Sequence, residues 1–107
     1  MDNQPQFTPG KWLTGNANVQ GVFSENGFII ADCSNTRTKN ECEANARLIA
    51  ASPIMYEALL AQEEANELYR QYDQTGGEPE KWEKFSVAED KAIALRKAVL
   101  AEIRKAE

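Results

Sequence analysis

The stretch that decides the fold runs from Glu41 to Leu60 and reads ECEANARLIAASPIMYEALL. Apolar residues recur along it at the three- and four-residue spacing of an amphipathic helix. Ser52-Pro53 interrupts the pattern, because serine is a good N-cap, proline suits the first helical position, and residues before proline avoid the α region. The stretch therefore predicts one helix that ends near residue 51 and another that begins at residue 53.

Upstream of this stretch, Thr38 is followed three residues later by Glu41. This capping-box spacing predicts that the first helix begins near Lys39. The apolar stripe of that helix is expected to consist of Cys42, Asn45, Ala46 and Ile49. An amide within such a stripe needs a partner, because leaving it unpaired and buried costs roughly 1–3 kcal/mol. The partner of Asn45 is either a nearby backbone group or a ligand.

The front of the chain is rich in strand-forming residues. Residues 19–24 and 28–33 are two such runs, and the Asn26-Gly27 dipeptide between them is the strongest short hairpin signal. A two-residue turn there predicts two cross-strand pairs, Phe23 with Ile30 and Val22 with Ala31. Both faces of the hairpin would then carry apolar side chains. We expect helices to cover one face and a second subunit to cover the other.

The rear of the chain reads as two long helices, at about residues 53–73 and 80–105, joined by a turn at Gly76-Gly77. The first is expected to bury Met55, Ala58, Leu59, Gln62, Ala65, Tyr69 and Tyr72. The second is expected to bury Phe85, Ala88, Ala92, Leu95, Val99 and Ile103. A short connection favours an antiparallel hairpin. A second capping box at Ser86 leaves open a split of the last helix.

These signals together predict an α+β fold in a single domain, residues 1–107. It comprises a small antiparallel N-terminal sheet at about residues 7–33, a short helix at 39–51, and the long antiparallel helical hairpin. A chain of 107 residues with 42% hydrophobic residues buries a modest core. We therefore expect a homo-oligomer, with the last helix at the interface.

The composition excludes several classes of function. The net charge is −5, and residues 53–107 carry twelve acids against eight bases, so duplex DNA and anionic membranes are poor partners. The first residues lack a basic start and an apolar run, and no segment approaches the length of a membrane helix. We expect a protein of the cytoplasm, in which Cys33 and Cys42 stay reduced.

The chain also lacks the residues that most catalytic and metal sites use. It contains no histidine, so a cysteine nucleophile would have no imidazole base and a zinc site would need carboxylates. It has neither a phosphate-binding loop ending in Gly-Lys-Ser/Thr nor a spaced-glycine dinucleotide loop. We therefore expect a binding protein without catalytic residues, metal or cofactor.

Two motifs suggest an origin. Phe7-Thr8-Pro9-Gly10-Lys11-Trp12 predicts a turn that brings two aromatic rings together. The second motif, residues 44–53, reads ANARLIAASP. The two motifs resemble those of a family of small bacteriophage-encoded proteins. The expected architecture is also similar to that of phage anti-defence sponge proteins, which sequester the cyclic nucleotide signals of the Thoeris defence.

The resemblance implies a phage accessory protein that acts against a host defence in the host cytoplasm. Five residues could form an anionic-nucleotide site around the first helix: Trp12, Arg37, Lys39, Asn45 and Arg47. In this hypothesis the basic side chains hold phosphate, Asn45 offers an amide and Trp12 stacks a base. Trp12 could instead serve only as a hydrophobic anchor. The alternative function is an acidic inhibitor or adaptor that binds a host defence protein.

Overall fold

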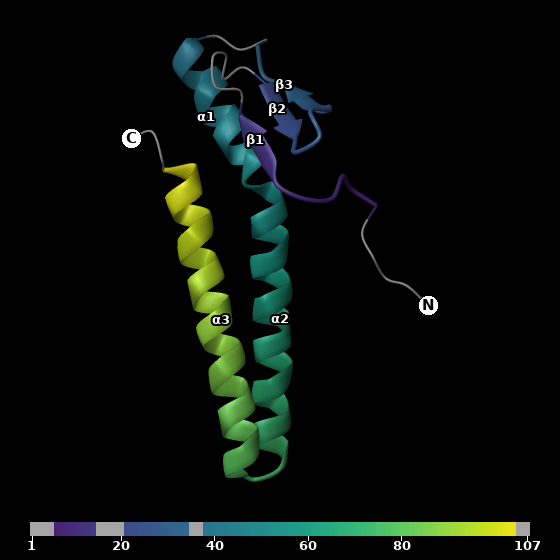
Figure 1. Ribbon diagram of the computed structural model, residues 1–107. Coiled ribbons are helices and arrows are strands. Elements are labelled where there is room, and N and C mark those ends of the chain that lie inside the picture. The colour runs from purple at the N-terminus through teal and green to yellow at the C-terminus, as the bar shows by residue number, and fades with distance from the viewer. Residues whose placement is uncertain (1–5, 15–20, 35–37, 105–107) are drawn as a thin grey trace. The chain divides into compact units, whose positions relative to one another are not determined.

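The computed structural model describes residues 6–14, 21–34 and 38–104. Its elements, in chain order, are β1 (Trp12–Thr14), β2 (Gly21–Ser24), β3 (Ile29–Asp32), α1 (Lys39–Ala50), α2 (Ser52–Gln74) and α3 (Pro79–Ile103) (Figure 1). The α+β class and the order of the elements are confirmed. The chain divides into two compact units, here called the front unit (Met1–Pro53) and the rear unit (Ile54–Glu107).

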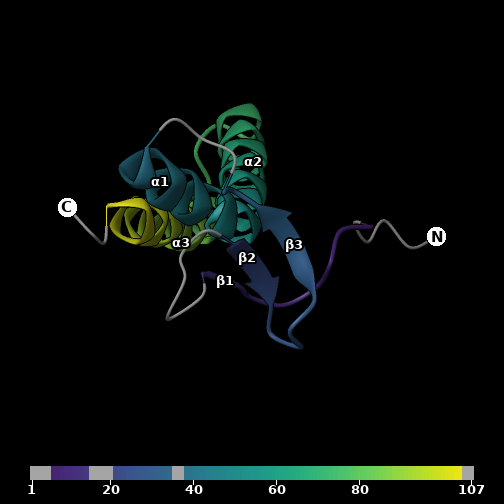
Figure 2. The same cartoon turned by 90° about the horizontal axis from the view of Figure 1, so that it is seen from above.

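The three strands of the front unit form one antiparallel sheet in the order β1-β2-β3. Figure 2 shows β2 and β3 as neighbouring arrows joined by a tight loop. The register places Leu13, Phe23 and Ile29 side by side across the sheet. Because side chains alternate along a strand, their neighbours Val22 and Ser24 point to the opposite face, where both are buried.

The loop between β2 and β3 differs from the two-residue turn that Asn26-Gly27 predicts. The Ser24 amide donates to the Phe28 carbonyl at 2.9 Å, and the Gly27 amide donates to the Ser24 carbonyl at 2.9 Å. These bonds close a three-residue loop, in which Gly27 alone takes a positive φ, of 88°. A type I turn followed by a left-handed glycine is a common loop of this length. Asn26 therefore does not need the strained left-handed backbone of a two-residue turn.

The longer loop changes the pairing of the strands. Phe23 pairs with Ile29, so the predicted pair of Phe23 with Ile30 is wrong. An irregularity between Val22 and Phe23 then restores the predicted pair of Val22 with Ala31. Ile30 takes the extra position between the two pairs and packs against the core of the front unit. One inserted residue thus decides which isoleucine packs against the core and which faces outward.

The core of the front unit lies between the sheet and α1. It consists of Val22, Cys33, Cys42 and Ala46, each at most 6% exposed. Trp12 and Ile49 pack against its margin. The helix that supplies Cys42 and Ala46 begins at Lys39, as predicted, because the Thr38 Oγ1 accepts a hydrogen bond from the Glu41 amide at 3.1 Å.

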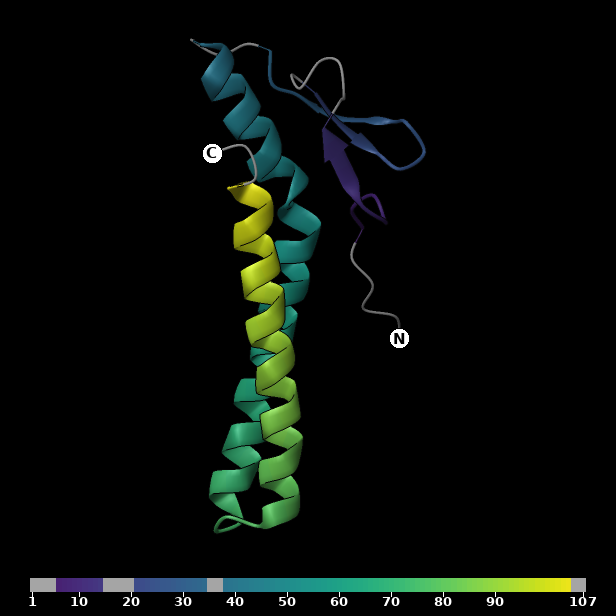
Figure 3. The same ribbon diagram turned by 60° about the vertical axis from the view of Figure 1, so that its left-hand side comes forward.

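The rear unit is an antiparallel pair of long helices (Figure 3). On α2 the buried seam differs from the predicted one: Ala58, Ala61 and Ala65 are buried and Leu68 and Tyr72 are half-buried. Leu59 was predicted to lie in the seam but is 71% exposed. The observed seam alternates steps of three and four residues throughout, and its alanines let the helices approach closely.

On α3 the predicted seam is largely confirmed. Ala88, Ala92 and Val99 are buried, and Phe85 and Leu95 are half-buried. The helix continues through the capping box at residues 86–89, so that signal does not split it. Gly76 and Gly77 both take positive φ in the turn before it, and Pro79 opens the helix, as the sequence predicts.

Aromatic contacts near this turn fix the register of the two helices. The ring centroids of Tyr69 and Phe85 are 5.2 Å apart, and those of Tyr72 and Trp82 are 5.1 Å apart. Because the helices are antiparallel, each step toward the C-terminus on α2 matches a step toward the N-terminus on α3.

Candidate functional site

The predicted site residues fall on β1, on α1 and on the segment between β3 and α1. Arg37 lies outside the described residues. The remaining four are Trp12 on β1 and Lys39, Asn45 and Arg47 on α1. They all belong to the front unit, so α1 determines how far apart most of them lie.

Trp12 is mainly a structural anchor in this arrangement. Its indole Nε1 donates to the Thr8 carbonyl at 3.0 Å, and its ring packs edge to face with Phe7 at a centroid distance of 6.2 Å. The ring also packs against the core of the front unit. The predicted meeting of the two rings across the Thr8-Pro9-Gly10 turn is thus confirmed. The Trp12 side chain is half-exposed, and only the exposed part of its indole is left for contact with a ligand.

Asn45 does not occupy the buried position that the sequence predicts. It is exposed, whereas Cys42 and Ala46 are buried. The buried face of α1 is centred between these two residues, and at about 100° per residue Asn45 falls beyond the edge of that face. Its amide is therefore solvated and needs no buried partner, so burial gives no reason to assign a ligand to it.

Among the described residues of the front unit, Arg47 carries a buried donor without a hydrogen-bond partner. It is half-buried, and its Nε atom is buried without a hydrogen-bond partner among the described residues. An unpaired buried donor costs about 1–3 kcal/mol, and more when the group is charged. An anion or a carboxylate placed beside this nitrogen would remove that cost.

The helix spacing limits which of these residues can act together. Lys39 and Arg47 are separated by eight residues, or about 12 Å along the helix, and by about 80° around it. An extended anion can reach both. Asn45 and Arg47 differ by about 200° around the axis, so they lie on opposite sides of α1. A ligand held by Arg47 therefore leaves Asn45 on the far side.

The two cysteines lie in the core rather than at a reactive surface. Cys33 and Cys42 are free and buried. Burial raises the pKa of the Cys33 thiol, and the neighbouring Cys42 raises it further. The Cys33 thiol is therefore protonated at neutral pH, and a protonated thiol is a poor nucleophile and metal ligand. Within the described ranges, no three Cys, Asp or Glu side chains are grouped so as to hold a metal ion.

The rear unit presents a surface that the sequence reasoning did not assign to any function. Leu59 is 71% exposed and Leu60 53% exposed, and the acids Glu57 and Glu63 lie beside them. This surface was not predicted, because the apolar pattern of α2 places Leu59 in the seam. The alternating three- and four-residue spacing of Ala58, Ala61 and Ala65 is the sequence signal that could have placed Leu59 outside the seam.

None of the helices that the structure describes combines the length and apolarity of a membrane span.

The profile of a family described as Salmonella phage P22 protein Y8K6 matches residues 1–106. No curated protein and no solved structure matches the chain.

Proposed function

This chain belongs to the family of Salmonella phage P22 protein Y8K6, and from this premise we propose that it is a phage accessory protein that acts by binding. Its ligand in this proposal is an anionic, nucleotide-type signal of a host defence, bound along α1 at Arg47. Its place of action is the host cytoplasm. A protein that sequesters a signal needs no catalytic group, and the chain contains no histidine to serve as one.

The observation that carries this proposal is the unpaired Nε atom of Arg47. The arginine fork is well suited to phosphate, because parallel N–H groups can donate to two oxygens at once. Burial of one of these donors strengthens the interaction, since water competes less for it. A phosphate at this position would satisfy the donor that the described residues leave unpaired.

Lys39 supports the same proposal from the start of the helix. It is exposed on the first turn of α1, where the helix dipole also favours negative charge. A ligand with two phosphate groups about 12 Å apart would reach both basic side chains. Nucleotides with several phosphates, such as cyclic oligonucleotides and ADP-ribose derivatives, have this extended anionic character.

Calorimetry with a panel of cyclic and ADP-ribose-derived nucleotides tests the proposal. We expect one class to bind, and Arg47→Ala to raise its Kd about tenfold or more, because a charge-assisted hydrogen bond is lost. Arg47→Lys should recover little, since lysine lacks the Nε donor and the fork geometry. Arg104→Ala removes an exposed arginine at the end of α3 and is the matched control.

Two results would overturn the nucleotide proposal. One is that no nucleotide of the panel binds and that native mass spectrometry of protein recovered from its host shows no bound small molecule. The other is that a nucleotide binds equally well to wild-type protein and to Arg47→Ala. In the second case the signal is held elsewhere on the chain.

The second candidate function is inhibition of a host defence protein. The observation that favours it is the exposed leucine pair of α2, Leu59 and Leu60, which lies among acidic side chains. Apolar side chains ringed by charge are common at protein interfaces, and the acids would steer a basic partner. Recovery of one host protein at fixed stoichiometry, lost in Leu59→Asp and retained in Arg47→Ala, would select this function over the first.

A further inference from the structure

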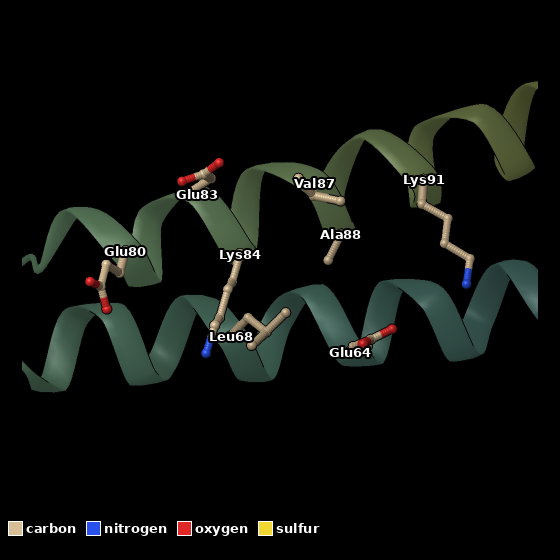
Figure 4. Close-up of a pocket in the computed structure, with 8 residues that line it drawn as sticks. All are labelled: Glu64, Leu68, Glu80, Glu83, Lys84, Val87, Ala88 and Lys91. Carbon is tan, nitrogen blue, oxygen red and sulfur yellow. The ribbon is translucent and has the colours of Figure 1, made fainter.

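The rear unit contains a groove of about 690 Å³ that runs between α2 and α3. Figure 4 shows its lining, with Leu68, Val87 and Ala88 at the centre and charged side chains around them. Val87 is 66% exposed. The charged residues of the lining are Glu64 on α2 and Glu80, Glu83, Lys84 and Lys91 on α3. A groove with an apolar centre and charges of both signs suits a partner with the same pattern.

The register of the helices places these residues close to level with one another. Tyr69 lies beside Phe85 and Tyr72 beside Trp82, and counting from these contacts places Leu68 level with Ser86, one residue before Val87. The same count, continued one turn away from the loop, places Glu64 level with Asp90, one residue before Lys91. Each helix therefore contributes to the groove one apolar residue and one charge within one residue, or about 1.5 Å, of the same height, and the two charges have opposite sign.

None of the groove charges forms an ion pair with another residue that the structure describes. The ion pair of Glu67 with Arg70 lies outside the groove lining. Glu64 and Lys91 lie on opposite rims and are both exposed. Their charges are thus available to a partner that presents a base to α2 and an acid to α3.

We infer that the partner is a second copy of this chain. A two-fold axis parallel to the helices, running along the groove, brings α2 of one subunit against α3 of the other at the same height. Glu64 then meets Lys91 of the partner subunit, and Leu68 meets Val87 of the partner subunit. The symmetry repeats both contacts, so the interface has two ion pairs at one height, on the two sides of the axis, and two apolar contacts one helical turn nearer to the loop.

The resulting assembly is a four-helix bundle in which neighbouring helices are antiparallel. This arrangement suits the helix dipoles and the geometry of such bundles. It also supplies what the isolated hairpin lacks. The side chains buried between α2 and α3 are mainly alanines, which remove little apolar surface from water. The exposed Val87 becomes buried only when the groove is covered.

Sedimentation equilibrium of the full-length chain tests the interface. We expect the wild-type protein to form a species of twice the 12.0 kDa chain mass. Glu64→Lys and Lys91→Glu should each raise the dimer Kd about tenfold or more, because each change places like charges together at two symmetric sites. The double variant E64K/K91E should return to within about threefold of wild type, since it restores both pairs in reversed order.

Two neighbouring substitutions are the matched controls. Glu63→Lys makes the same charge change one residue from Glu64, and Lys97→Glu makes the opposite change on α3; both sites are exposed and outside the groove lining. We expect each to leave the Kd within about threefold of wild type, since exposed charges off an interface contribute little.

Three outcomes would overturn the inference. The wild-type chain could stay a 12.0 kDa species up to about 100 µM, a concentration at which even weak homodimers form. The double variant could remain as weak as the single variants, which would mean that Glu64 and Lys91 do not pair. The dimer could also persist unchanged in every variant, which would place the interface on another surface.

Discussion

The front unit and the rear unit bury different kinds of side chain. In the front unit a sheet and a helix enclose Val22 and Cys42, the largest side chains that are fully buried among the described residues. In the rear unit two helices meet along alanines, and larger residues such as Leu59 and Val87 stay exposed. A sheet packed on a helix encloses branched side chains. In this helical pair the closest packing is over small side chains, and larger ones are left at the surface.

The largest effect is expected from a charge placed in the alanine seam. Ala92 is fully buried on α3, whereas Ala94, two residues further on, is exposed. Ala92→Glu should lower the free energy of unfolding by about 3 kcal/mol or more, because it buries an unpaired charge between close-packed helices. Ala94→Glu should change it by less than about 0.5 kcal/mol. Urea unfolding followed by circular dichroism measures both, and equal effects would show that the seam is not closed.

The same substitution made in both units sharpens the comparison further. Val22 is fully buried in the front unit, and Val87 is mostly exposed in the rear unit. Val22→Ala should cost about 2 kcal/mol, from the lost methyl groups and the cavity they leave. Val87→Ala should cost less than about 0.5 kcal/mol in the monomer, because alanine is also the better helix former. A larger effect of Val87→Ala at high protein concentration alone would report burial in the dimer.

Removing one helix cap and adding another should change the stability by smaller amounts, with opposite sign. Thr38 caps α1 with a side-chain hydrogen bond, whereas Glu78, the N-cap of α3, makes none. Thr38→Ala should therefore destabilise the protein by about 1 kcal/mol. Glu78→Ser should stabilise it by about 0.5 kcal/mol, because serine can accept from a free amide of the first turn. Thermal unfolding of the two variants should show shifts in opposite directions, and a gain from Thr38→Ala would contradict the assigned cap.

The smallest expected effect on stability comes from the lowered pKa values of two exposed carboxylates, Asp32 and Glu67. Hydrogen bonds from Ser34 lower the pKa of Asp32 below its ordinary value, and the hydrogen bond and charge of Arg70 lower the pKa of Glu67 below its ordinary value. Both groups therefore favour the folded state above their ordinary pKa, and that contribution is lost as the pH falls through the lowered value. High salt should raise the pKa of Glu67 more than that of Asp32, because salt screens the charge of Arg70. A side-chain NMR titration with and without salt measures both values, and an equal response would contradict this assignment.

Local signals in the sequence were enough to predict the elements of the fold. The capping residue Thr38, the break at Ser52-Pro53 and the turn at Gly76-Gly77 each act within a few residues, and each marks an observed boundary. The seam of α3 was also predictable, because its apolar residues recur at regular steps of three and four. The capping, the break, the turn and the spacing of the α3 seam depend on backbone propensity and helical period, which a single stretch of sequence contains.

The candidate site was less predictable from the sequence. Basic residues on the first helix indicated Lys39, at its start, and Arg47, in its last turn, but nothing local showed that the Arg47 Nε atom lies buried and unpaired. The stripe of Cys42, Asn45, Ala46 and Ile49 predicts a buried amide at Asn45, but Asn45 is exposed. Where the edge of the buried face of α1 falls depends on how the sheet packs on the helix, and this contact joins segments far apart in the chain.

What the sequence by itself determined is therefore the type, order and limits of the helices and strands. Tertiary structure alone decided which isoleucine of β3 faces the core, because the three-residue loop at Gly27 shifts the register and a bulge shifts it back. It also decided that alanines, rather than Leu59, form the seam of α2. Several stripes of one helix satisfy the same apolar period. The stripe that closes is the one whose small side chains allow the two backbones to approach most closely.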